Sequence, residues 1–225
     1  MRRHLIKTMV FSLVLLFTSH AFAQESAKEV TKKVQAFYKQ TKDYHATFKQ
    51  TYHDLAAGSS KISGGTVYFK KPGRMRWIYM NTKNPKARDK EYISDGSKFW
   101  VYEHEFKQVF KQCLKDSQLP SSLSFLMGQG DLLKSFTVSF SDKSTKSAPQ
   151  LRLLPKKKTS MYKEVRFTLN PKTFQVDKTE IFDPYGNSNE IVFSNSKINK
   201  NLPDSGFSFK VPKSARVLNP QKQCP

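Results

Sequence analysis

The fold is decided by the stretch Phe69-Lys70-Lys71-Pro72-Gly73-Arg74-Met75-Arg76-Trp77-Ile78-Tyr79. Pro-Gly at its centre indicates a tight turn, because proline fixes φ and glycine tolerates a positive φ. In the arm that follows, side chains alternate with period two, so Met75, Trp77 and Tyr79 share one face and the two arginines share the other. The stretch therefore predicts a β-hairpin at one edge of a large apolar concave surface.

Elements predicted along the rest of the chain are one helix, a strand meander, a short helical insertion and more strands. Ser26 and Glu29 have the spacing of a capping box, and the apolar stripe that follows predicts a helix to about Lys42. Turn signals then divide the chain into about eleven strands, including one that begins at Phe174 and a last one with Phe207, Phe209 and Val211. The insertion at 119–133 is predicted as one or two short helices, capped by Ser121 or Ser122 and by Asp131.

The first 23 residues predict a secretory signal peptide. Three basic residues precede an apolar run at 9–17, and Ala21-Phe22-Ala23 forms a small-x-small cleavage site. The residue after the cut is Gln24 rather than cysteine, so no lipid attachment is expected. We therefore expect a single exported domain at residues 24–225, since a chain of this length most simply builds one core.

The chain is strongly basic, with a formal net charge of +21. Such an excess favours anionic partners, which include lipid surfaces, acidic proteins and nucleic acids. An exported protein rarely meets nucleic acid, and the basic residues are scattered over many predicted strands. We expect no nucleic-acid binding, and we interpret most of the charge as a solvated surface.

Catalytic, nucleotide and metal motifs are absent from the sequence. His45 and His53 lie eight residues apart along one predicted strand, which is too far for joint metal ligation. We find neither a glycine-rich phosphate loop nor a G-x-S-x-G motif. We expect no enzyme, no cofactor and no metal site, and a catalytic site built from scattered residues is the alternative. The two cysteines, Cys113 and Cys224, fit a single disulfide or two free thiols equally well.

An ordered set of short motifs resembles the periplasmic outer-membrane lipoprotein carrier (LolA-type) family over nearly the whole mature chain. The motifs are Phe37-Tyr38, the run from Tyr44 to Gln50, Lys71-Pro72, Ser94-Asp95-Gly96 with Trp100-Val101-Tyr102, the segment 120–126, and Phe207-Ser208-Phe209-x-Val211-Pro212. The resemblance implies a mainly β fold with helices (α+β). It is an incomplete, strongly curved antiparallel β-barrel whose hydrophobic concave face is covered by helices.

The resemblance also implies a function, a location and partners. The function is a periplasmic chaperone that shields the acyl chains of lipoproteins and shuttles them to the outer membrane. The partners are acylated lipoproteins, an inner-membrane ABC-type releasing complex and an outer-membrane acceptor, and the carrier is a monomer. The family's lid-holding arginine corresponds to Lys71 here, and Arg74 and Arg76 are candidates to compensate.

Candidate acyl-binding residues follow from the hairpin and the helical insertion, where glycine permits hinged movement and methionine adapts to irregular shapes. They are Phe48, Val67, Phe69, Met75, Trp77, Tyr79, Trp100, Leu123, Phe125, Leu126 and Met127. Each of these side chains could equally be ordinary core. Two other functions fit the same resemblance: a carrier of another amphiphile, such as a glycolipid, and a non-catalytic sensor of stray lipoproteins.

Overall fold

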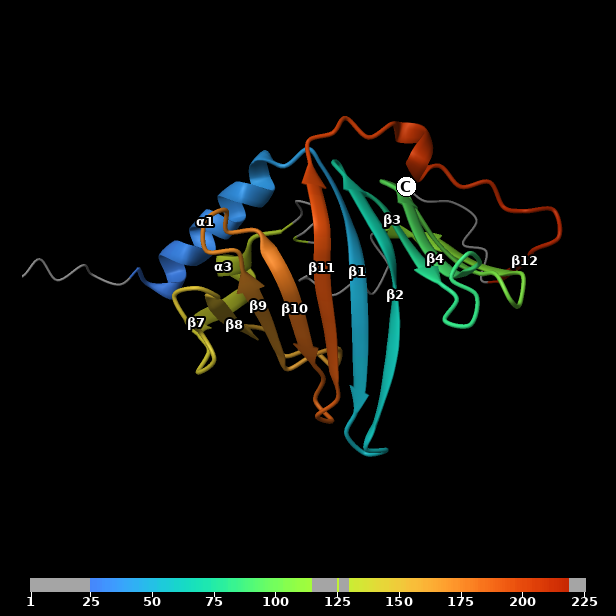
Figure 1. The fold of residues 1–225 in the computed structure, drawn as a ribbon. Coiled ribbons are helices and arrows are strands. Elements are labelled where there is room, and N and C mark those ends of the chain that lie inside the picture. The colour runs from blue at the N-terminus through green and yellow to red at the C-terminus, as the bar shows by residue number, and fades with distance from the viewer. Residues whose placement is uncertain (1–24, 115–124, 126–129, 219–225) are drawn as a thin grey trace, which may run out of the picture.

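The computed structural model describes residues 25–114, 125 and 130–218, which form one sheet with a helix lying across one of its faces (Figure 1). The helices are α1 (Ala27–Gln40), α3 (Leu132–Ser135) and the 3-10 helix η2 (Asp204–Phe207). The strands are β1 (Asp43–Asp54), β2 (Ser59–Lys70), β3 (Arg74–Met80), β4 (Arg88–Asp95), β5 (Lys98–Glu103), β6 (Gln108–Cys113), β7 (Phe136–Phe140), β8 (Gln150–Pro155), β9 (Glu164–Leu169), β10 (Val176–Phe182), β11 (Ser188–Ile198) and β12 (Arg216–Leu218).

The twelve strands lie in the order β12-β6-β5-β4-β3-β2-β1-β11-β10-β9-β8-β7. All neighbours pair antiparallel except β12, which runs parallel to β6. In the described part of the chain, β12 and β7 are the two edges of this order and do not pair with each other. The prediction of a mainly β fold with few helices is confirmed, with twelve strands in place of about eleven.

The predicted hairpin is formed by β2 and β3. Val67 pairs with Trp77 and Phe69 pairs with Met75, and Gly73 adopts a φ of 65° in the turn. Further along the hairpin, a Cβ on Gly65 would lie 1.8 Å from the Ile78 carbonyl oxygen, so only glycine fits there. The hairpin thus brings its apolar side chains to one face of the sheet, as its alternation predicts.

Helix α1 begins and ends where its sequence predicts. Ser26 and Glu29 form the capping box, in which the Ser26 hydroxyl accepts from the Glu29 N–H and the Glu29 carboxylate accepts from the Ser26 N–H. Val30, Val34 and Tyr38 are buried on one side of the helix and join the main apolar cluster of the sheet. We call the face of the sheet that carries this cluster the concave face, and the opposite one the convex face.

The C-terminal segment differs from its prediction. Phe207 closes η2 instead of beginning a strand, and Phe209 and Val211 lie outside any strand. These two side chains pack on the convex face against a second apolar cluster of Ile93, Trp100, Tyr102 and Val109. The apolar alternation of this segment therefore arises because its side chains pack on the face of the sheet, and not because its backbone pairs with a strand. We call residues 204–215 the strap, which Figure 1 shows leading from β11 towards β12.

The strand expected to begin at Phe174 starts two residues later, because Phe174 lies in the turn before β10 with a φ of 61°. Its N–H donates to the Asn170 carbonyl, which closes that turn. Among the described residues, no helix is long and apolar enough to cross a membrane.

Candidate functional site

The apolar wall predicted from the hairpin is present on the concave face. Five of its predicted members are buried in the main cluster, namely Phe48, Val67, Phe69, Met75 and Trp77. Tyr79 is half-buried and packs against this cluster. The Phe48 ring lies 4.9 Å from both the Trp77 and the Tyr79 ring centroids in edge-to-face arrangements. β1, β2 and β3 therefore supply one continuous aromatic surface.

Phe125 connects α1 to β9 within the same apolar cluster. It is buried in the main cluster, and its ring lies edge-to-face on Tyr38 at 5.1 Å and stacks on Phe167 at 6.3 Å. Phe125 thus lies where α1 covers the sheet, as expected for a residue of the covering segment. The other predicted members of that segment, Leu123, Leu126 and Met127, lie outside the described residues. Asp131 caps α3 as predicted, since its carboxylate accepts from the N–H groups of Leu133 and Lys134.

Trp100 does not belong to the wall. It lies on the convex face, where its ring centroid is 5.9 Å from that of Phe209 in the strap. Strand alternation explains the difference, because Phe99 and Val101 are the β5 residues that contact the concave cluster. The sequence pattern did not reveal which of the two apolar rows of β5 faces inward.

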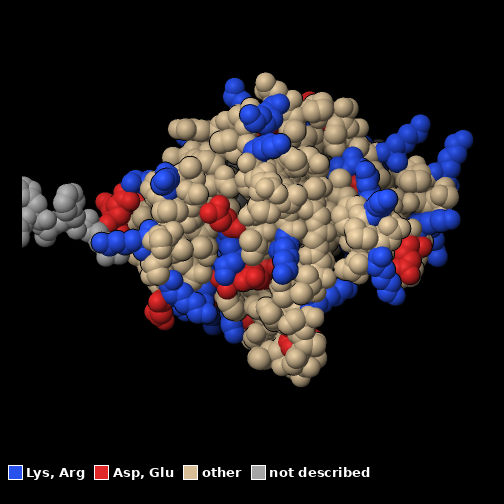
Figure 2. Space-filling view, viewed as in Figure 1, with Lys and Arg blue, Asp and Glu red and all other residues tan. Residues whose placement is uncertain are grey.

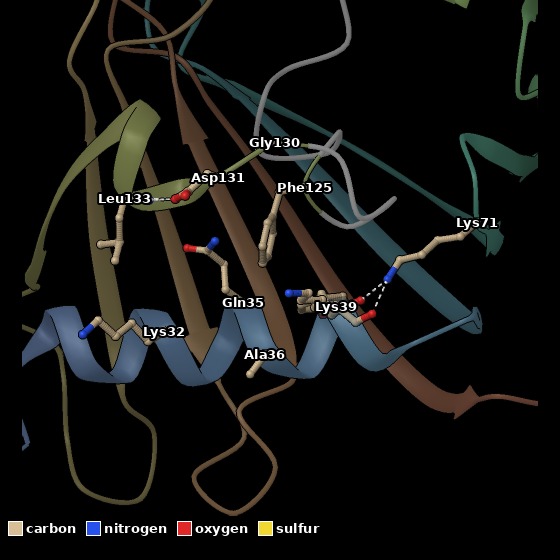
Figure 3. A pocket seen from close by; sticks show the side chains of 10 residues that line it. Lys32, Gln35, Ala36, Lys39, Lys71, Phe125, Gly130, Asp131 and Leu133 are labelled. Carbon is tan, nitrogen blue, oxygen red and sulfur yellow. Dashed lines mark hydrogen bonds between the residues drawn. The ribbon is translucent and has the colours of Figure 1, made fainter.

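Lys71 holds the C-terminal end of α1. Its ammonium group donates to the Tyr38 carbonyl and, at 2.9 Å, to the Lys39 carbonyl (Figure 3). A cation at a helix C-terminus also interacts favourably with the helix dipole. Partial burial lowers the pKa of Lys71, which shows that desolvation opposes the charged form. Lys71 therefore ties α1 to the turn of the hairpin, and desolvation of its ammonium group opposes this tie.

Arg74 and Arg76 point to the other face. Arg74 pairs with Asp204 of η2 at 3.4 Å, and Arg76 pairs with Glu91 at 2.7 Å and donates to the Gly206 carbonyl at 3.1 Å. Among the described residues, neither arginine bonds to α1. They hold the strap, and the hypothesis that they compensate for the missing arginine at position 71 is not supported by their contacts.

The convex face also buries a carboxylate that the sequence did not reveal. The Glu91 side chain is 2% exposed and bonds to Arg76, Arg88 and His104. Desolvation acts to raise the pKa of Glu91, but the hydrogen bonds from Arg88 and Arg76 outweigh it and leave the pKa lowered. This cluster stabilises the sheet beneath the strap.

A cavity of about 540 Å³ lies between α1, Lys71 and the segment that leads into α3 (Figure 3). Lys32, Gln35, Ala36, Tyr38 and Lys39 of α1 form one side. The other side is formed by Phe125, Gly130, Asp131 and Leu133. Tyr38 and Phe125 also belong to the main apolar cluster, so this cavity adjoins the wall.

The histidines are not brought together. His45 stacks on Tyr68 at 4.5 Å, His53 bonds to Ser60, and His104 bonds to Glu91. In the part of the chain that the structure describes, no group of three histidine, cysteine or acidic side chains could hold a metal ion. Cys113 is disulfide-bonded. Cys224 lies outside the described residues, so its pairing with Cys113 stays a prediction.

The fold and the wall define a class of protein: a bent sheet with an apolar face that a helix covers in part. The chain belongs to the family described as outer membrane lipoprotein carrier protein LolA, whose model matches residues 39–210. It is 28% identical over 218 residues to the outer-membrane lipoprotein carrier protein of Methylobacillus flagellatus, covering 97% of this chain and 99% of that one. It is 29% identical over 222 residues to the corresponding protein of Ralstonia nicotianae, covering 96% of each.

Among solved structures, an uncharacterized conserved protein from Thermus thermophilus matches with a TM-score of 0.51 at 13% identity. The match covers 86% of this chain and 99% of that one, and it concerns the fold alone. Family membership makes this chain a lipoprotein carrier, a non-enzymatic transport protein of a periplasmic family. The prediction of a carrier rather than an enzyme is thereby confirmed.

Proposed function

We propose that the mature chain, residues 24–225, shields lipoprotein acyl chains against the wall formed by Phe48, Val67, Phe69, Met75, Trp77 and Tyr79. The cargo is received from an inner-membrane ABC-type complex and passed to an outer-membrane acceptor. The chain is exported by the signal peptide at 1–23 and works as a monomer. Lysine and arginine side chains are scattered over the face in Figure 2, which favours a solvated surface over one nucleic-acid patch.

The observation that carries this proposal is the way α1 and Phe125 lie over the concave cluster, to which the wall also belongs. Tyr38 and Phe125 contact each other over the concave cluster, and Lys71 holds the helix end through two carbonyls. The Tyr38 hydroxyl also accepts from the Val176 N–H, and much of this cover consists of apolar side chains, which an apolar ligand can replace. The same surface then serves as core in the free protein and as a binding wall in the loaded one.

The energetics require such a cover. Burying an acyl chain contributes about 0.8 kcal/mol per CH₂, so a long chain gains on the order of 10 kcal/mol in an open apolar site. Cargo bound that tightly would not be released to an acceptor. Displacing α1 and Phe125 from the concave cluster costs part of this gain, and the net affinity falls to a range in which transfer is reversible.

Photo-crosslinking tests the wall directly. A photoreactive phenylalanine analogue at Tyr79 is expected to crosslink to a bound acylated peptide, because Tyr79 is half-buried on the concave face. The matched control is the same replacement at Tyr68, which is also half-buried but stacks on His45 on the convex face. Equal adducts at both positions, or none at Tyr79 while the variant stays folded, would refute the assignment.

A carrier of another amphiphile is the second candidate, and the strong excess of basic over acidic residues favours it for anionic glycolipids. Native mass spectrometry of protein isolated from its own periplasm distinguishes the two. A bound lipopeptide mass supports the lipoprotein carrier, and a glycolipid mass supports the alternative.

A further inference from the structure

Gln35 lines the cavity beside α1, and its side-chain oxygen is a buried hydrogen-bond acceptor without a donor among the described residues. Gln35 Oε1 is shielded from solvent and finds no hydrogen-bond partner in the described part of the chain. Buried side-chain oxygens are rarely left unpaired, because the group loses its water without replacing it. An unpaired amide oxygen on a residue that lines a cavity is therefore an observation that points to a ligand.

Neighbouring groups do not satisfy this amide. Figure 3 shows the Gln35 side chain directed from α1 towards the space beside Phe125 and Asp131. The Asp131 carboxylate is engaged by the N–H groups of Leu133 and Lys134. Lys71 donates to the carbonyls at the end of α1.

The cavity lies at a boundary between apolar and polar surroundings. Tyr38 and Phe125 line it from the side of the apolar cluster, and the exposed Lys32 and Lys39 line it from the side of the solvent. Its volume of about 540 Å³ falls in the range of small-molecule sites. Such a volume suits a polar group with a few methylenes attached, whereas a complete lipid would extend beyond it.

We propose that this cavity binds an amide group at the polar end of an acyl chain, with Gln35 as its partner. An amide offers one N–H donor and one carbonyl acceptor. It therefore matches the side-chain amide of Gln35 whichever way that group is turned. An ester lacks the donor and leaves Gln35 Oε1 unpaired. This inference rests on the proposed acyl-carrier function and adds to it a polar subsite that selects the linkage of the chain.

Two probes that differ in one group test the inference. N-(2-hydroxyethyl) acyl amide and 2-hydroxyethyl acyl ester, with the same saturated chain, are compared by displacement of a fluorescent fatty acid from the full mature chain. The amide is expected to bind about fivefold to tenfold more tightly than the ester, as one or two net hydrogen bonds imply. A third probe, the acyl ester of glycolamide, places the amide further out and distinguishes an amide on the chain itself from a following peptide group.

Gln35→Met removes the amide and keeps a side chain of similar length with good helix propensity. The preference for the amide is expected to fall to about one, while ester affinity and melting temperature do not decrease. Gln40→Met is the matched control on the same helix, since Gln40 is exposed and does not line the cavity. It should leave the preference unchanged.

The outcomes separate the two proposals. Equal binding of amide and ester by the wild type overturns the amide site and leaves the carrier function intact, as does a preference that survives in Gln35→Met. If neither probe displaces the fatty acid and the fatty acid itself does not bind, the acyl-carrier proposal fails and the amide site fails with it.

Discussion

Lys71→Met tests whether the cover competes with cargo. In the free protein the ammonium group donates to the carbonyls of Tyr38 and Lys39 at the end of α1. Methionine has a comparable length and no donor, so the substitution removes both bonds and leaves the packing of the stem nearly unchanged. The helix end keeps its other support, because the Thr41 hydroxyl still donates to the Phe37 carbonyl.

The magnitude follows from the contacts. Hydrogen bonds to a charged group contribute about 1.5–3 kcal/mol each, and a cation at a helix C-terminus adds about 0.3–1 kcal/mol. Burial opposes these gains, as the lowered pKa of Lys71 shows. Because solvent also screens a partly exposed ammonium group, we expect a net contribution of about 1–2 kcal/mol, which is less than the sum of these gains. If cargo must displace α1, losing this contribution should raise cargo affinity by about fivefold to thirtyfold.

Two measurements on the same variant check this reasoning. Acyl-probe displacement should show the rise in affinity, and thermal unfolding should show a melting temperature about 2–8 °C lower. Lys42→Met is the control, because Lys42 is exposed just beyond the helix and Lys71, not Lys42, donates to the carbonyls at its end. This variant should leave both measurements unchanged. A Lys71→Met protein that is less stable but binds no more tightly would show that the bond supports the fold without restraining cargo.

Two further predictions concern stability. Glu91→Gln should lower the free energy of unfolding by about 3 kcal/mol, because it leaves Arg76 and its neighbours without their buried counter-charge. The control is Glu103→Gln, which removes a charge from a more exposed pair with Lys90 and should lower the free energy of unfolding by less than about 1 kcal/mol. The folded pKa of Glu91 lies below its ordinary value of 4.5, so the difference in unfolding free energy between wild type and Glu91→Gln should be complete above pH 4.5. This difference should disappear as the pH falls through the folded pKa, and a difference that does not change with pH would contradict the charge argument. Reduction of the Cys113 disulfide should lower the free energy of unfolding by about 2–4 kcal/mol, measured by denaturant titration with and without reductant, and coincident curves would show that the bond does not stabilise the native state.

The hairpin and α1 were predictable from sequence because their signals are local. Pro-Gly with alternating flanks and a capping box each specify geometry within a few residues, and β2, β3 and α1 adopt the predicted positions. The wall followed from the same alternation. Met75 and Trp77 are buried together because the period of a strand fixes which side chains share a face.

What could not be predicted depends on contacts between distant segments. Both rows of β5 are apolar, so the outward position of Trp100 depends on its pairing with Ile93 of β4 and its packing against the strap, which local sequence does not reveal. Phe209 and Val211 alternate as in a strand because they pack on a sheet, and local sequence does not distinguish these two causes. The Gln35 site likewise depends on α3 and Phe125, and in the sequence the strands β1 to β6 lie between these residues and α1.

The hairpin explains how one sheet can bind cargo and still remain folded when the cover moves. Its inward residues, Met75 and Trp77, form the wall, while its outward arginines hold the strap through Asp204, Glu91 and the Gly206 carbonyl. The convex face therefore keeps its own buried cluster and ion pairs, which do not depend on α1. Only the concave face exchanges one apolar partner for another. A carrier with no recognisable nucleotide motif needs this separation, because loading and release must then be driven by differences in affinity alone.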